Sequence, residues 1–435
     1  MTSLAIRGGR IFDPANGVDA ISDVLLVDGR VTAVGPDAGK DADETIDARG
    51  MVVAPGFVDI HCHLRQPGFE HKETIATGTL AAARGGFTTV CAMPNTVPPT
   101  DSAAGVEFVL RTAQAEGVVR VLPIACVTRG RAGRELADLS ELAGAGAVAF
   151  SDDGSPVADA NMMRRALEYA GMLDKPVIDH CEDLALAAGG VMQEGWVSTR
   201  LGLRGIPAAA EETMVARNIA LAEQTGCAVH LAHVSTAGSV GLIRQAKARG
   251  IPVTAEVTPH HLALTHEAVL LGPAEVAGGL AYDTNAKVNP PLRSRSDAEA
   301  CVAGLLDGTI NCIATDHAPH AVQDKFCEFD HAAFGISGLE TAFSLALTVV
   351  PLEDVVRSLT ISPVRVLDLD RRIEGLGTLS AGAPGDIVII DPDSERTVEP
   401  AGFASKGKNT PLGGRALRGR IVTTIAGGRT VFDAR

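Results

Sequence analysis

The sequence predicts an α/β protein: a (β/α)8 TIM-type barrel with a small β-sandwich domain formed from both chain termini. Three observations support this prediction. The central part of the chain alternates apolar β-like runs with stretches rich in Ala, Leu, Glu and Arg. The two ends carry short β-like runs separated by turns that contain Gly. Hydrophobic residues make up 46% of the chain but aromatic residues only 3%, which indicates the aliphatic core of a parallel sheet covered on both faces.

Residues 1–54 and 373–435 form the predicted β domain. In the first segment, Asp28-Gly29 separates two alternating runs, which is a good hairpin signal because this dipeptide readily adopts the positive φ angles of a two-residue turn. The second segment has the same character, with Gly427-Gly428 between two short runs. We expect both ends to assemble into one domain; two unrelated β appendages are the alternative.

Residues 55–372 form the predicted barrel. Stretches with a helical pattern, such as 160–173 and 211–225, separate eight β-like runs there. Eight strands alternating with helices match a (β/α)8 barrel. A doubly wound sheet is the rival fold, but it does not readily explain the polar residues at the strand ends. The runs cover residues 56–63, 88–93, 119–127, 147–151, 176–181, 228–234, 252–257 and 310–315.

Charge and cysteine content limit the partners and the location. The chain has 38 Lys and Arg against 53 Asp and Glu, and the net charge of −15 argues against nucleic acid or an anionic membrane as a partner. The eight cysteines include no CxxC pair, and reduced thiols indicate a cytoplasmic protein. The N-terminus lacks the apolar stretch of a signal peptide, and no uncharged apolar run approaches the roughly 20 residues of a spanning helix.

Imidazoles and carboxylates recur at the ends of the predicted barrel strands, where the catalytic residues of such barrels lie. His61 and His63 are two residues apart and therefore share one face of their strand. Each residue alone is more often structural than a ligand, but their common position at one end of five strands predicts a metal site. The set is His61, His63, Asp153, His180, His233 and Asp316.

These side chains are sufficient to hold two zinc ions with a carboxylate between them. Metal ions of this kind lower the pKa of water and so allow hydrolysis at neutral pH. Asp316 is the candidate catalytic residue, because it can bind one metal ion and also carry a proton from the nucleophile to the leaving group. The sequence therefore predicts metal-assisted hydrolysis of an amide-like bond.

Around these residues, the whole chain resembles the amidohydrolase superfamily and, more narrowly, the bacterial class I dihydroorotases. Several segments carry the resemblance jointly, and together they are highly specific. They are MVVAPGFVDIHCHLRQPG at 51–68, MPNT at 93–96, SDDG at 151–154, HCE at 180–182, HLAHVS at 230–235, EVTPHH at 256–261, KVNPPLR at 287–293, TDHAPH at 315–320 and FGISGLET at 334–341.

The resemblance implies the reversible cyclisation of N-carbamoyl-L-aspartate to (S)-dihydroorotate and water, the third step of de novo pyrimidine biosynthesis. It implies that the six residues above bind one or two Zn2+ ions per subunit and that Asp153 bridges the pair. Many members of the superfamily use a carboxylated lysine at this place, whereas residues 147–154 contain no lysine. This difference argues against hydantoinases and allantoinases.

The resemblance also implies the residues that bind the substrate. Arg65 offers a planar guanidinium that can bind the carboxylate of dihydroorotate through two parallel hydrogen bonds. Asn95 and His320 are expected to add hydrogen bonds to this carboxylate, and the backbone of Phe334 and Gly335 to contact the ring. The predicted set is His63, Leu64, Arg65, Asn95, Asn289, His320, Phe334 and Gly335.

The predicted partners are a small-molecule substrate (carbamoyl aspartate or dihydroorotate), a second copy in a homodimer and, as a further option, aspartate carbamoyltransferase in a complex. Two alternative functions differ from the dihydroorotase. An inactive homologue that only scaffolds aspartate carbamoyltransferase is disfavoured because all six ligands are present. A hydrolase of hydantoin or another cyclic ureide is disfavoured by the missing lysine and by the presence of Arg65 and Asn95.

Two further expectations concern the surroundings of the site. Loop 321–333 is predicted to close over the substrate, a static surface loop being the alternative. The resembling family has Pro where this chain has Ala333, and its loss is expected to loosen the loop. His230 and His317 are expected to support the ligands from behind, and His261 to be structural.

Overall fold

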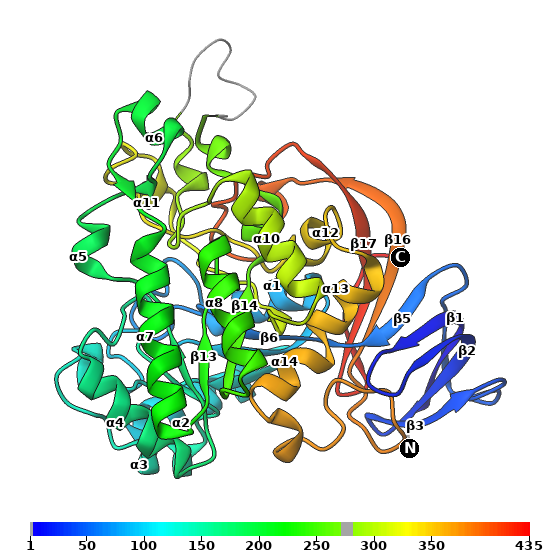
Figure 1. Cartoon of the computed structure of the whole chain (residues 1–435). Helices are drawn as coiled ribbons and strands as arrows, with labels where there is room; N and C mark the ends of the chain where they lie inside the picture. Colours follow the sequence, from blue (N-terminus) through cyan, green and yellow to red (C-terminus); the bar gives the residue numbers. More distant parts are fainter. Residues whose placement is uncertain (1–2, 271–281) are drawn as a thin grey trace.

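The computed structural model describes residues 3–270 and 282–435, which form a barrel surrounded by helices and an adjoining β unit (Figure 1). Both chain ends lie in the β unit, while the middle of the chain builds the barrel. Within the described residues, no helix is long and apolar enough to cross a membrane. All eight cysteines are free thiols, in agreement with their unpaired spacing.

Eight parallel strands form the barrel. β6, β7 and β8 pair in sequence order, and β9, β10, β13, β14 and β15 form a second parallel arc. Parallel bridges at Ala125–Phe150 and Cys62–His317 join the two arcs into a ring. The eight predicted strands are therefore confirmed, and the doubly wound sheet is excluded. The strands are β6 (Phe57–Cys62), β7 (Phe87–Ala92), β8 (Arg120–Pro123), β9 (Phe150–Ser151), β10 (Val177–Asp179), β13 (Val229–Leu231), β14 (Val253–Val257) and β15 (Cys312–Ile313).

A helix follows each barrel strand. Several of these helices begin at capping side chains, such as Thr74, Ser102 and Asp159, that accept a hydrogen bond from the backbone of the first turn. The helices in chain order are α1 (Ile75–Arg84), α2 (Ala103–Glu116), α3 (Leu139–Ala145), α4 (Ala160–Gly171), α7 (Ala209–Thr225), α8 (Ala237–Ala248), α10 (Arg295–Leu306) and α13 (Leu352–Leu359).

Shorter elements lie in the connections. They are β11 (Met192–Gln193), β12 (Gly205–Ile206), α5 (Leu184–Ala187), α6 (Trp196–Leu201), α9 (Pro259–Ala263), α11 (Val322–Lys325), α12 (Ala342–Ala346), α14 (Ile361–Val366) and 3-10 turns at Arg129–Arg131, His266–Leu270, Thr284–Ala286, Leu369–Arg371 and Pro400–Gly402.

The barrel core is mainly aliphatic, as the composition predicts. One apolar cluster joins the strands to the surrounding helices, and a second joins residues such as Ile60 and Ile178 to α14. Aromatic residues are few but well buried, and Phe57 packs against both Phe87 and Phe343. Tight packing on this scale holds the strand ends, and the polar residues on them, in fixed positions.

The β unit contains both ends of the chain, as predicted. Its strands form one mixed sheet in the order β18-β17-β16-β5-β1-β2-β3, with β4 beside β1. The pairing of β5 with β16 joins the two terminal segments, which excludes two separate appendages. Asp28 and Gly29 have φ angles of 48° and 80° and form the predicted hairpin between β2 and β3. The strands are β1 (Ser3–Asp13), β2 (Val18–Val27), β3 (Arg30–Gly35), β4 (Glu44–Asp47), β5 (Val52–Pro55), β16 (Ile387–Thr397), β17 (Ala416–Ala426) and β18 (Arg429–Asp433).

Candidate metal centre and substrate cavity

The six predicted ligands meet in one buried place at the carboxyl ends of the barrel strands. His61 and His63 lie at the end of β6, and the other four follow β9, β10, β13 and β15, so that only the closed barrel brings the six together. All six side chains are buried. They are His61, His63, Asp153, His180, His233 and Asp316.

The two carboxylate oxygens of Asp153 face two different pairs of histidines. Oδ2 lies 3.5 Å from Nε2 of His61 and 3.4 Å from Nε2 of His63. Oδ1 lies 3.5 Å from Nε2 of His233 and 3.7 Å from Nδ1 of His180. We call the His61/His63 side, together with Asp316, the first half of the centre and the His180/His233 side the second half. A carboxylate between two histidine pairs has the position of a bridge between two metal ions.

Asp316 completes the first half. Its Oδ1 lies 3.0 Å from Nε2 of His63 and 3.5 Å from Nε2 of His61. Burial would raise the pKa of Asp316, but the hydrogen bond with His63 and the nearby His61 outweigh it and lower that pKa below its usual value. Asp316 is therefore ionised at neutral pH, as both a ligand and a proton acceptor require.

The ligand atoms fit a pair of metal ions. His61, His63 and Asp316 form one cluster, and His61, Asp153 and His233 form another, with the ligand atoms within 4.8 Å of one another in each. Among the described residues, His61 Nε2 and Asp153 Oδ1 are buried polar atoms without a hydrogen-bond partner. Such orphaned atoms are costly unless something binds them, and imidazole nitrogens with carboxylate oxygens are common metal donors. The two clusters are consistent with a binuclear metal site.

Backbone conformation also marks this region. Arg65, His233 and Asp316 have φ angles of 59°, 34° and 44°, in the left-handed region that side chains rarely adopt. Each such residue costs on the order of 1–3 kcal/mol and persists only where the surroundings enforce it, commonly at functional sites. Three site residues in this conformation indicate that the surrounding structure holds these side chains in place at a cost in stability.

A neighbouring carboxylate anchors the loop that carries Asp153. Asp152 accepts hydrogen bonds from the backbone N–H groups of Val127 and Thr128 at 3.0 and 3.1 Å. The guanidinium of Arg131 donates to the carbonyl oxygens of Asp152 and Asp153. These bonds fix the backbone on both sides of the Asp153 side chain, so its two oxygens keep their orientation.

The histidines of the first half are held through their second ring nitrogen. His61 Nδ1 lies 2.5 Å from Oε1 of Glu256, and His63 Nδ1 lies 2.8 Å from Oδ1 of Asn95. Burial would raise the pKa of Glu256, but His61 and His230 lower it to about 2. The sequence analysis assigned no role to Glu256. The sequence offers one indication of a role: Glu256 is the only charged residue in the β-like run 252–257. A buried carboxylate is costly unless it is paired, so its presence there indicates a partner.

The second half is held more loosely. His180 Nε2 lies 3.4 Å from Glu182 and 3.4 Å from the side-chain nitrogen of Asn289. Burial would lower the pKa of His180, but Asp153 and Glu182 raise it to about 10 in the absence of metal. Nδ1 of His233 is buried and has no hydrogen-bond partner in the described part of the chain.

Of the two predicted supporting histidines, His230 lies behind the centre, whereas the ring of His317 contacts no proposed ligand. His230 is buried behind the ligands and its Nε2 lies 3.1 Å from Glu256. His317 accepts a hydrogen bond from the backbone of Gly338 and does not line the cavity. His261 bonds to Thr258 and to the carbonyl of Pro290, which agrees with a structural role.

A cavity of about 220 Å³ opens next to the centre. Most predicted substrate contacts line it: His63, Arg65, Asn95, Asn289, His320, Phe334 and Gly335. Leu64 differs, because its side chain belongs to the apolar core and lies against α1 at Gly78. A substrate contact by Leu64 would have to come from its backbone. Gly154, Val288 and Ala318 also line the cavity, and the sequence analysis did not name them.

Arg65 and His320 occupy the same wall of the cavity. The guanidinium of Arg65 donates to the carbonyl of Pro319 and lies 3.5 Å from Nε2 of His320. Burial, together with Arg65 and two lysines, lowers the pKa of His320 to about 3. Its neutral ring donates from Nε2 to the carbonyl of Phe334 at 2.8 Å. The predicted donation from His320 to substrate therefore competes with a bond inside the protein.

Asn409, from the C-terminal segment between β16 and β17, holds two walls of the cavity together. It accepts a hydrogen bond from the backbone of His320 at 2.9 Å and donates to the carbonyls of Ala318 and Gly335 at 3.0 Å each. In the same segment, the hydroxyl of Ser405 donates to the carboxylate of Glu73 at 2.5 Å, and Glu73 lies just before α1. This segment was predicted to belong to the β domain, and no sequence pattern predicted its contact with the site.

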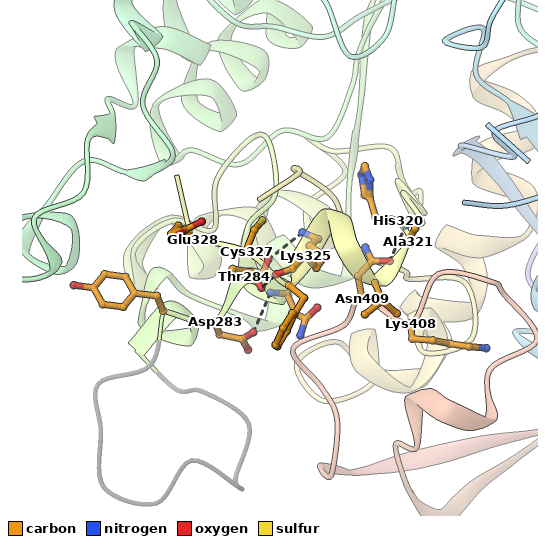
Figure 2. Close-up of a pocket in the computed structure, with 13 residues that line it drawn as sticks. Asp283, Thr284, His320, Ala321, Lys325, Cys327, Glu328, Lys408 and Asn409 are labelled. Atoms are coloured by element: carbon orange, nitrogen blue, oxygen red, sulfur yellow. Dashed lines mark hydrogen bonds between the residues drawn. The ribbon is translucent and has the colours of Figure 1, made fainter. Parts of the chain in front are cut away.

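A larger pocket of about 760 Å³ lies beside the cavity, and His320 lines both (Figure 2). Loop 321–333 forms much of this pocket. The ammonium of Lys325 donates to the carbonyls of Thr284, Lys287 and Ala333 at 3.0, 3.0 and 2.6 Å. The backbone N–H of Ala333 donates to the backbone carbonyl oxygen of Asp324 at 2.9 Å, and a proline at position 333 could not make this bond. These bonds tie the loop down despite the missing proline.

The fold and the centre together define a class. A (β/α)8 barrel with a His-x-His pair on its first strand, and a carboxylate between two pairs of histidines, is the arrangement of the metal-dependent amidohydrolase superfamily. In agreement, the structure resembles L-hydantoinase from Arthrobacter aurescens, with a TM-score of 0.86 and 25% identity over 100% of this chain and 96% of that one. It also resembles dihydropyrimidinase from Brevibacillus agri, with a TM-score of 0.83 and 22% identity over 99% and 95%.

Within this superfamily the sequence is more specific. A dihydro-orotase-like family model matches residues 50–239. The chain is 55% identical over 439 residues to the dihydroorotase of Pelotomaculum thermopropionicum and 52% identical over 436 residues to that of an Anaeromyxobacter species, covering 99% of this chain and 99% and 98% of the relatives. The chain belongs to the dihydroorotase family.

Proposed function

We propose that the protein catalyses the reversible conversion of N-carbamoyl-L-aspartate to (S)-dihydroorotate and water, in pyrimidine biosynthesis, with zinc as the metal. One observation carries the proposal. The carboxylate oxygens of Asp153 face two separate histidine pairs, directly beside a cavity that presents the guanidinium of Arg65. This arrangement suits a hydrolysable amide and a carboxylate in one small molecule, which is what dihydroorotate combines.

The proposed metal ligands are His61, His63 and Asp316 in the first half, His180 and His233 in the second, and Asp153 in both. When bound, two divalent ions supply Lewis acidity that lowers the pKa of water and polarises a carbonyl oxygen. Zinc suits this donor set of imidazoles and carboxylates.

Substrate binding is assigned to the opposite wall. Arg65 binds the carboxylate of the substrate through its planar guanidinium. Asn95 uses its oxygen to hold His63, which leaves its amide N–H groups to donate to the same carboxylate. Asn289 binds from the side of His180, and the backbone of Phe334 and Gly335 contacts the ring.

Asp316 moves the proton. In the hydrolytic direction, water adds to the ring carbonyl carbon and the bond from that carbon to the ring nitrogen breaks. Asp316 accepts a proton from the attacking water and gives it to the departing nitrogen. The biosynthetic direction reverses these steps, so it begins with a protonated carboxyl group and should be favoured at lower pH.

We further propose a cytoplasmic location, since the cysteines are free thiols. A homodimer and a complex with aspartate carbamoyltransferase stay predictions.

The test compares substrates and metal states. Ring opening of dihydroorotate is followed by ultraviolet absorbance with the zinc-loaded protein, with the same protein after chelation, and after zinc is returned. We expect activity only with metal and little or none on hydantoin. A zinc-loaded protein that leaves dihydroorotate intact but opens hydantoin would make it a hydrolase of other cyclic ureides. Inactivity on both would favour a scaffold.

A further inference from the structure

Glu256 is a fully buried carboxylate in the middle of the barrel, and neither the ligand set nor the substrate contacts include it. It lies on β14, the seventh barrel strand, which supplies no proposed metal ligand. A charge in such a place is expensive to bury unless its partners compensate it. Its contacts therefore decide what it does.

The carboxylate of Glu256 contacts residues of two other strands. Oε1 lies 2.5 Å from Nδ1 of His61 on β6 and 3.3 Å from the backbone nitrogen of His233, which follows β13. Oε2 lies 3.1 Å from Nε2 of His230 on β13. His230 Nδ1 in turn lies 2.8 Å from the hydroxyl of Thr254 on β14 itself. The carboxylate thus touches one proposed ligand through its ring and a second through its backbone.

These contacts fix the proton on the His61 ring. An ionised carboxylate only accepts hydrogen bonds, so Nδ1 of His61 must carry the hydrogen. This leaves Nε2 as the ring nitrogen that can bind a metal ion, and this atom lies 3.5 Å from both Asp153 and Asp316. Within the described residues it has no hydrogen-bond partner. Nε2 therefore faces the place where a metal ion would lie between the two aspartates.

Asp59 provides a comparison on the same strand as His61. It is equally buried, but its carboxylate accepts from the backbone and hydroxyl of Thr315 and from the backbone nitrogen of His61. No hydrogen bond joins it to an imidazole ring within the described residues. Asp59 ties the first strand to the last, whereas Glu256 acts on the ring of a ligand.

We propose that Glu256 is a positioning residue of the metal centre: it orients His61, holds the hydrogen on Nδ1 and makes Nε2 a stronger metal donor. This inference rests on the proposed zinc centre. Carboxylates behind metal-binding histidines commonly have this effect, and removing them weakens metal binding about 10- to 100-fold.

The experiment measures zinc affinity and stability separately in Glu256→Gln. Free zinc is set with chelator buffers, zinc per chain is measured, and thermal unfolding is followed with and without metal. Glutamine keeps the shape but removes the charge. We expect zinc affinity to fall about 10- to 100-fold. The metal-free variant should be less stable than the metal-free wild type, because His61 and His230 lose their charged partner, and the loss of stability should be larger with zinc, because the variant binds it more weakly. Raising zinc should restore activity on dihydroorotate.

Asp59→Asn is the matched control, and we expect its zinc affinity to stay near that of the wild type. If Glu256→Gln does not fold, Glu256→Asp replaces it; this variant keeps the charge but shortens the side chain, and it should also bind zinc more weakly. Wild-type zinc affinity in the Glu256 variant, or an equal loss of stability with and without metal, would overturn the positioning role alone. A wild type that binds zinc nowhere would overturn the proposed centre as well.

Discussion

The two halves of the metal centre share Asp153 but differ in how the rest of the protein holds their ligands. In the first half, the second ring nitrogens of His61 and His63 pair with oxygens at 2.5 and 2.8 Å. In the second half, Nδ1 of His180 lies 2.9 Å from Nε2 of His233, but Nε2 of His180 has contacts of only 3.4 Å and His233 Nδ1 has no partner within the described residues. The first half is therefore arranged before metal binds, whereas the second half depends more on the metal to order it.

The largest effect is expected from Asp316→Asn, which removes the proton carrier from the first half. The amide oxygen can still face the metal, so both zinc ions should remain, while turnover of dihydroorotate falls about 10²- to 10⁴-fold. Turnover and zinc per chain are measured together. Asp307→Asn, at a surface pair with Arg244, is the control and should be fully active. Near-normal turnover in Asp316→Asn would remove its proton role.

Because the two halves are held differently, we expect them to lose metal one after the other. As free zinc is lowered, the second half should empty first, with about 10- to 100-fold weaker affinity, because fewer surrounding groups orient its ligands. Zinc per chain against free zinc should show two steps. The pair His63→Asn and His180→Asn sharpens the assignment: the first should remove the tight step and the second the weak one. A single step in the wild type contradicts the difference between the halves.

Arg65→Lys tests the cavity without changing either half. Lysine keeps the charge but cannot form two parallel hydrogen bonds with a carboxylate. We expect KM for dihydroorotate to rise about tenfold, in line with the loss of one charged hydrogen bond, with both zinc steps unchanged. Steady-state kinetics at several substrate concentrations separate KM from kcat. Arg129→Lys, at a surface pair with Glu135, serves as the control. An unchanged KM would place the carboxylate elsewhere.

The smallest effect is expected from Ala333→Pro, which restores the residue of the resembling family. Because the backbone N–H of Ala333 donates to Asp324, proline should cost about 1 kcal/mol of unfolding free energy. Thermal unfolding of the zinc-loaded protein measures this, and Ala333→Ser keeps the N–H as a control. A gain in stability would show that the bond matters less than the stiffness of proline.

The barrel and the meeting of the six candidate ligands at one end of it could be predicted because the signals are local. Apolar runs that alternate with helical stretches mark the strands. A ring of parallel strands then brings their carboxyl ends together, whatever the details of the packing. His180 and His233 are far apart in sequence, yet each lies near the end of such a run, so their meeting follows from topology alone. The hairpin at Asp28-Gly29 is local in the same way.

Other parts of the site depend on contacts that no local pattern encodes. Glu256 pairs with His61 across 195 residues, and Asn409 reaches His320 across 89. The direction of the Leu64 side chain depends on helix packing at Gly78, although its neighbours in sequence line the cavity. The hydrogen bond from Ala333 to Asp324 likewise depends on how the loop folds. The exchange of proline for alanine, taken alone, therefore predicted a looser loop.

The position of Asn409 in the chain has a consequence for synthesis. All six proposed ligands lie before residue 317, but Asn409, whose side chain fixes the cavity walls at His320 and Gly335, belongs to a segment that is made after the barrel. When the ribosome has released the whole barrel segment, the new chain still lacks Asn409. The cavity walls at His320 and Gly335 should therefore take their final positions only after Asn409 has left the ribosome.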